Sequence, residues 1–152
     1  MEKIPIRILI VDDFEPWRRM LVCLIHKKEN LTVIAEASDG MEGVQKAKEL
    51  QPDLVLLDIG LPRLNGIEAA KQILEASPAS KILIVSEDSS VDTARKALES
   101  GALGYVVKSD GELLNGIETL LEGRRFISAS LAPHFVLATA EHSLLMLITG
   151  LF

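Results

Sequence analysis

The chain alternates short, fully apolar runs rich in β-branched residues with longer stretches in which apolar residues recur at helical spacing. Unbroken apolar runs of this kind are typical of strands buried on both faces of a parallel sheet. We therefore expect strands at residues 6–11, 32–37, 54–58, 81–86 and 104–108. Each strand leads into a stretch of helical length, and the predicted helices cover residues 15–28, 40–50, 66–77, 91–101 and 111–123.

Five β-α units joined by short links predict the fold class. Such a succession gives an α/β protein whose five-stranded parallel sheet is doubly wound, with helices on both faces. Ligands of these sheets bind beyond the carboxyl ends of the strands. The residues of interest therefore end or follow the strands, and they are Asp12, Asp13, Asp58, Ser86 and Lys108.

Taken singly, these polar residues also have ordinary structural explanations. Asp13 fits a helix cap, and Asp58 fits the turn before Pro62. Ser86 fits the start of a loop, and Lys108 fits a solvated surface charge. Four of the five strands, however, end in polar or charged residues at the same edge of the sheet. That coincidence favours a functional site.

The charge at this edge predicts a cation site. Two carboxylates about 4 Å apart repel each other by about 4 kcal/mol at an effective dielectric constant near 20. Asp12, Asp13 and Asp58 bring three negative charges, against one positive charge from Lys108. Mg²⁺ suits a site with few carboxylates and room for a phosphoryl group. A carboxylate beside Mg²⁺, a lysine and a hydroxyl is equipped for phosphoryl transfer, with Asp58 as the nucleophile that forms an aspartyl-phosphate.

Four motifs over roughly residues 5 to 123 carry a family resemblance. They are "VDD" at 11–13, "LLDIGLPRLNG" at 56–66, "IVS" at 84–86 and "GYVVK" at 104–108. In this order they resemble the receiver domain of bacterial two-component response regulators. The resemblance implies a flavodoxin-like sheet with strand order 2-1-3-4-5. It also implies a phosphorylation-switched signalling receiver in a phosphorelay, which is a phosphoacceptor with slow self-catalysed phosphorylation and dephosphorylation and not an enzyme.

The resemblance also implies a set of site residues. Asp58 would accept the phosphoryl group from a sensor histidine kinase. Mg²⁺ would be held by the carboxylates of Asp12, Asp13 and Asp58 and by the backbone carbonyl of Gly60.

Further residues would contact the phosphoryl group or respond to it. Ser86 and Lys108 would contact its oxygens. Ser86 and Tyr105 would form the switch, because the Tyr105 ring would move as Ser86 is drawn to the phosphate. This movement would bias the surface made by the fourth helix, fifth strand and fifth helix, which is a candidate homodimer interface.

Two positions depart from the pattern common among receivers. Glu87 and Asp88 follow Ser86, where many receivers have a small residue, so we expect phosphorylation rate and lifetime to be affected. Ser109 follows Lys108 where many receivers have proline. A cis bond before a non-proline residue costs about 3–4 kcal/mol, so this loop is either strained or differently shaped.

Beyond the receiver, expected at residues 1–123, we expect a linker at 124–136 and a helical tail at 137–152. The segment "RRFIS" and the tail resemble the exit and the first helix of a LuxR-type helix-turn-helix output. The alternative interpretation is therefore the receiver part of a DNA-binding transcription regulator whose output domain is truncated here. No Lys or Arg follows Arg125, so we expect no DNA binding from this chain alone.

The composition limits the binding partners and the cellular compartment that we expect. The net charge of −6 gives no general basic field for nucleic acid or anionic lipid, and the single cysteine suits a reducing compartment. No apolar run reaches the roughly 18 residues of a membrane span, so we expect a soluble, cytoplasmic protein.

A flavin carrier is disfavoured because Asp12 and Asp13 would repel the flavin phosphate. An aspartate-nucleophile phosphatase usually separates its two acids by one residue, whereas here they are adjacent.

Overall fold

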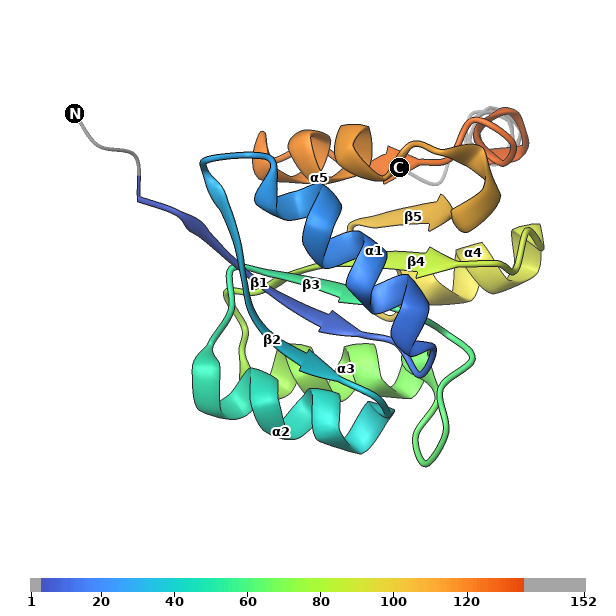
Figure 1. Ribbon diagram of the computed structural model, residues 1–152. Helices are drawn as coiled ribbons and strands as arrows, with labels where there is room; N and C mark the ends of the chain where they lie inside the picture. Colours follow the sequence, from blue (N-terminus) through green and yellow to red (C-terminus); the bar gives the residue numbers. More distant parts are fainter. Residues whose placement is uncertain (1–3, 136–152) are drawn as a thin grey trace.

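A computed structural model describes residues 4–135, which form a parallel sheet between two layers of helices (Figure 1). The strands are β1 (Ile6–Val11), β2 (Leu31–Ala37), β3 (Leu54–Leu57), β4 (Lys81–Ser86), β5 (Gly104–Val107) and β6 (Phe126–Ile127). The helices are α1 (Glu15–His26), α2 (Gly40–Leu50), α3 (Gly66–Ala76), α4 (Val91–Glu99) and α5 (Leu113–Leu121), with a 3₁₀ turn, η1 (Lys108–Asp110). The order β2-β1-β3-β4-β5-β6 confirms the predicted order and adds a short sixth strand.

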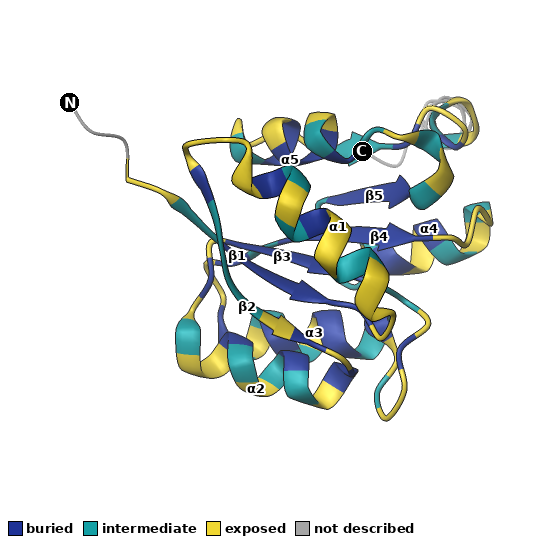
Figure 2. Cartoon of the chain, viewed as in Figure 1, coloured by how far each residue is buried: buried dark blue, intermediate teal, exposed yellow. Residues whose placement is uncertain are grey.

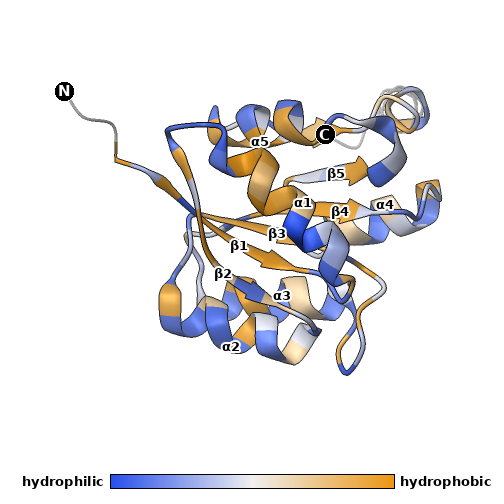
Figure 3. Cartoon of the chain, in the orientation of Figure 1, coloured by the Kyte–Doolittle hydropathy of each residue, from blue (hydrophilic) through white to orange (hydrophobic). Residues whose placement is uncertain are grey.

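The apolar runs are buried because both faces of the sheet are covered. In β1, Ile8 and Ile10 belong to the apolar cluster on the face covered by α1 and α5, whereas Leu9 and Val11 belong to the cluster on the face covered by α2, α3 and α4. The central strand β3 is accordingly buried along its whole length (Figure 2) and hydrophobic (Figure 3). Burying one such side chain contributes about 1.5–3 kcal/mol. The buried sheet therefore fixes the backbone positions of the residues at the ends of its strands.

Local side chains fix where the helices begin. The carboxylate of Asp39 accepts a hydrogen bond from the Glu42 amide (2.8 Å) at the start of α2, and Asn65 does the same for the Glu68 amide (3.0 Å) at the start of α3. Each cap satisfies a backbone donor that has no partner within its helix. The loops at the carboxyl edge of the sheet are thereby held at their far ends.

Part of the predicted linker at 124–136 has regular structure. Phe126 and Ile127 form β6, which pairs in parallel with β5. Ser128 is fully buried: its amide donates to the Tyr105 carbonyl (2.9 Å), and its hydroxyl accepts from the Val107 amide (2.8 Å). The apolar side chains of this segment pack on the edge strand, which a pattern of only two strand residues does not reveal. The expected tail at 137–152 lies outside the described residues.

Replacing Ser128 with Ala is expected to lower the free energy of unfolding by about 2 kcal/mol, because it leaves the buried amide of Val107 unpaired. Urea denaturation followed by circular dichroism measures the change. The matched control is Ser89→Ala, which removes an exposed hydroxyl in the loop after β4, with an expected change below about 0.5 kcal/mol. Equal losses in the two variants would contradict this account of Ser128.

Candidate functional site

The carboxyl ends of β1, β3, β4 and β5 converge on one cavity of about 540 Å³. Its walls include every residue predicted for the site except Tyr105. The lining residues are Asp12, Asp13, Phe14, Asp58, Ile59, Gly60, Ser86, Glu87, Asp88 and Lys108. Asp58 and Lys108 stand just after their strands, so the buried strand ends fix their backbones while their side chains reach the rim.

Lys108 lies between two carboxylates. Its Nζ is 2.7 Å from Asp12 Oδ2 and 3.9 Å from Asp58 Oδ2. The Lys108 side chain is only 10% exposed, and those of Asp12 and Asp58 are 3% and 12% exposed. Charges this poorly solvated interact far more strongly than surface ion pairs. The lysine therefore bridges the ends of β1 and β3.

Three carboxylates lie close enough together that they could hold a metal ion. Asp12, Asp13 and Asp58 each offer an oxygen, and these oxygens all lie within 4.8 Å of one another. Only Asp13 among them is exposed. An all-oxygen set of this size, open to water on one side, fits Mg²⁺. Gly60 lines the same cavity.

The environment of Asp58 raises the pKa of its carboxyl above the ordinary value of 3.8. Burial is the largest cause, and the Asp12 carboxylate adds to it. The Lys108 ammonium and the amides of Ile59 and Gly60 act in the opposite direction. The Ile59 amide donates directly to Asp58 Oδ1 (2.8 Å). Ionised Asp58 is thus held at an energetic cost, which a bound cation would relieve.

Replacing Asp58 with Asn is expected to stabilise the fold at neutral pH. Because folding raises the pKa of Asp58, the folded state binds the proton more tightly, and stability is lost as pH rises from 3.8 through the folded pKa. The amide side chain of the variant carries no charge, so the variant should lack this loss. The test is to compare the urea midpoints of the parent and of Asp58→Asn across that pH range, without divalent cations. If Asp58→Asn is less stable than the parent at pH values above the folded pKa of Asp58, the raised pKa does not destabilise the parent as described.

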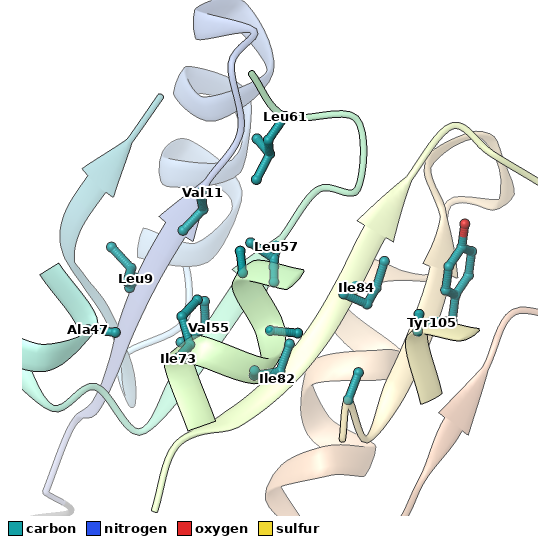
Figure 4. Close-up of a cluster of buried hydrophobic side chains, with 14 of the residues drawn as sticks. Leu9, Val11, Ala47, Val55, Leu57, Leu61, Ile73, Ile82, Ile84 and Tyr105 are labelled. Atoms are coloured by element: carbon teal, nitrogen blue, oxygen red, sulfur yellow. The ribbon is translucent and has the colours of Figure 1, made fainter. Parts of the chain in front are cut away.

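Ser86 and Tyr105 meet at the loop that follows β4. The Ser86 hydroxyl accepts from the Asp88 amide (3.1 Å), and the Tyr105 hydroxyl donates to the Asp88 carbonyl (2.6 Å). Tyr105 is fully buried in the core beside Ile84 (Figure 4). Burial raises the pKa of Tyr105 to about 12, so its hydroxyl remains a donor. Both predicted switch residues therefore hold the same loop residue.

The two departures from the receiver pattern have structural outcomes. Glu87 and Asp88 line the cavity, so its described walls carry five carboxylates against the single Lys108. The Lys108–Ser109 peptide bond is trans, and the chain turns there through η1. The loop is therefore differently shaped and does not adopt the cis form.

The structure adds one residue that the sequence did not single out. The ring centroid of Trp17, on α1, lies 4.8 Å from Lys108 Nζ. The sequence placed Trp17 on a helix but gave no sign of a contact with a residue so far along the chain. Its position shortly after the Asp12–Asp13 pair is the only available signal.

A family model and the sequences of known proteins match this chain to the same family. The family model described as the response regulator receiver domain matches residues 8–118. The response regulator GacA of Pseudomonas viridiflava is 33% identical over 138 residues, which cover 90% of this chain and 64% of that protein. The transcriptional regulatory protein LiaR of Bacillus subtilis is 35% identical over 140 residues, covering 91% and 66%. The chain thus spans slightly less than two thirds of these relatives.

Solved structures agree with this result. A two-component response regulator of the LuxR family from Aurantimonas sp. SI85-9A1 superposes with a TM-score of 0.84 at 37% identity, covering 90% of this chain and 99% of that one. Among residues 4–135, none of the helices has the length and apolar character needed to cross a membrane.

Proposed function

The chain belongs to the response regulator receiver family, a family of phosphorylation-switched signalling domains, and on this premise we propose that Asp58 is its phosphoacceptor. The observation that carries the proposal is the place of this carboxylate. It lies at the end of a buried central strand, 3.9 Å from the Lys108 ammonium and within reach of the Asp12 and Asp13 oxygens. Among the described residues that line the cavity, only Lys108 brings a positive charge to the phosphoryl oxygens.

The donor we propose is a phosphohistidine of a sensor kinase. An Asp58 carboxylate oxygen attacks the phosphorus, and the bond from phosphorus to the imidazole nitrogen breaks. The electron pair stays on that nitrogen, which takes up a proton. The product is a mixed anhydride on Asp58, which water slowly hydrolyses. Lys108 stabilises the charge that the phosphoryl oxygens carry during transfer, the usual role of a lysine in such sites.

We propose Mg²⁺ as the cofactor, held by Asp12, Asp13, Asp58 and the Gly60 carbonyl. When bound, it supplies positive charge to the carboxylates and to the phosphoryl oxygens. The three converging carboxylates, with only one lysine against them in the described cavity, support this assignment. Without a cation, the repulsion among them would oppose the approach of an anionic donor.

The switch we propose runs through the loop after β4. A phosphoryl oxygen on Asp58 would draw the Ser86 hydroxyl away from the Asp88 amide. Because Tyr105 holds the carbonyl of the same residue, its hydroxyl bond would be disturbed as well. The change would reach the surface of α4, β5 and α5, where we propose that a homodimer forms.

A second proposal is that this chain is the receiver part, with a linker and tail after residue 123, of a DNA-binding regulator in the cytoplasm. It rests on the relatives, which are named as regulators and are longer than the matched region. DNA would then be bound by an output domain outside this chain.

Incubation with acetyl phosphate and Mg²⁺, followed by intact mass spectrometry, tests the proposed function. One phosphoryl adduct is expected, and it should be lost in Asp58→Asn or after addition of a chelator. The matched control is Asp92→Asn, which removes a carboxylate 81% exposed on α4 and should leave the adduct unchanged. Absence of an adduct with any donor would overturn the phosphoacceptor assignment.

A further inference from the structure

The indole of Trp17 lies beside the lysine of the site. Its ring centroid is 4.8 Å from Lys108 Nζ, within the range in which a ring face attracts an ammonium group. It is the single tryptophan of the chain. The attraction is stronger where the cation is poorly solvated, and the Lys108 side chain is only 10% exposed.

Lys108 borders three cavities. It lines the acidic cavity, a second cavity of about 370 Å³ between α1 and α5, and a third of about 380 Å³ beside Glu87 and Ser109. Trp17 lines the second and the third, so its ring forms the wall against which the ammonium rests.

Trp17 packs against the apolar cluster on the α1 and α5 face of the sheet, but this packing leaves space unfilled. A cavity remains between α1 and α5 directly beside it, so the ring does not close that gap. Its Nε1 is buried and finds no hydrogen-bond partner within residues 4–135. A buried indole N–H normally has a partner. The ring is therefore held by packing against the apolar cluster and by the contact with Lys108, since no hydrogen bond within residues 4–135 orients it.

We propose that Trp17 is a positioning residue for phosphoryl transfer, holding the Lys108 ammonium close to Asp58. This inference rests on the proposed function of Asp58. The ammonium is nearer to Asp12 (2.7 Å) than to Asp58 (3.9 Å), and the negative charge of a phosphoryl group on Asp58 would draw it away from Asp12. A ring face attracts a cation without a fixed direction, and it supports the ammonium in both places. A carboxylate or amide in the same place would compete for it.

The test compares three variants in the acetyl phosphate assay, with maximal rate and half-saturating donor concentration measured separately. Trp17→Met keeps apolar volume but removes the aromatic face, and we expect its maximal rate to fall about tenfold, the size of one modest electrostatic contact. Trp17→Phe restores a ring and should recover most of the rate. Met20→Leu changes the same cavity wall away from Lys108 and should match the parent.

A Lys108→Met background separates positioning from a structural role. There, Trp17→Met should cause no further loss, because the group that the ring positions is gone. An equal loss in both backgrounds, or a Trp17→Met rate equal to the parent's, would overturn the inference and leave Asp58 as phosphoacceptor. An unsubstituted chain that takes up no phosphoryl group would overturn the proposed function itself.

If the Trp17 variants do not fold, a measurement on the unsubstituted chain still tests the inference. The fluorescence of Trp17 should change in proportion to the adduct fraction seen by mass, because Lys108 moves relative to its ring. The change should be absent in Lys108→Met loaded to the same fraction by longer incubation. Full phosphorylation with unchanged emission would overturn the inference.

Discussion

Replacing Lys108 with Met is expected to slow Mg²⁺-dependent phosphorylation of Asp58 by about 100-fold or more, the usual cost of removing one preorganised electrostatic group. The same change should lower the free energy of unfolding by about 3 kcal/mol without divalent cations. The reason is that the nearly buried Asp12 carboxylate then loses its ammonium partner at 2.7 Å. Initial rates by intact mass and urea denaturation measure the two effects.

Saturating Mg²⁺ should recover much of the lost stability, because a cation bound to the carboxylates replaces the missing positive charge. The matched control is Lys71→Met, since Lys71 is 55% exposed and pairs only loosely with Glu68 at 4.0 Å. Its stability should change by less than about 0.5 kcal/mol. A Lys108→Met protein that is phosphorylated at the parent's rate would contradict the role given to this lysine.

Replacing Gly66 with Ala is expected to lower the free energy of unfolding by about 3 kcal/mol and to displace Asp58. A Cβ at position 66 would lie 2.1 Å from the Asp58 carbonyl oxygen and 2.6 Å from Ile59 Cα. Both neighbours are backbone, so the end of β3 or the start of α3 must shift. Overpacking of this kind commonly costs about 1–3 kcal/mol. Urea denaturation and the acetyl phosphate assay together report the two consequences.

Gly60 gives the matched control in the same loop. A Cβ there would meet nothing within 4 Å, so Gly60→Ala should leave stability close to that of the parent. If Gly66→Ala is as stable as the parent, the loop between β3 and α3 can shift to accept the added Cβ at little cost. The close approach would then not be what holds Asp58 in place.

The fold was predictable because its signals are local. Runs such as Leu54–Leu57 are apolar without a break, which is typical of a strand covered on both faces. The site residues followed from the same pattern, since parallel strands bring their carboxyl ends to one edge. Asp12, Asp13, Asp58 and Lys108 meet as expected, and each follows a strand that the pattern locates.

Contacts between distant segments were not predictable in this way. The contact of Trp17 with Lys108 depends on how α1 crosses the sheet, which helical periodicity does not specify. Ser128 is a similar case, because its hydroxyl fills a gap in the hydrogen bonding of β5 that only the folded chain creates. The depth of Tyr105 also depends on packing, since a strand aromatic can lie inside or outside.

The most direct test of the central claim is to locate the phosphoryl group. Borohydride reduction of the phosphorylated chain converts an acyl phosphate into an alcohol, and tandem mass spectrometry of the peptides then identifies the modified residue. We expect the modification at Asp58 alone, dependent on Mg²⁺ and absent from Asp58→Asn. Modification at Asp12 or Asp13, or at no carboxylate, would contradict the assignment of Asp58 as the phosphoacceptor.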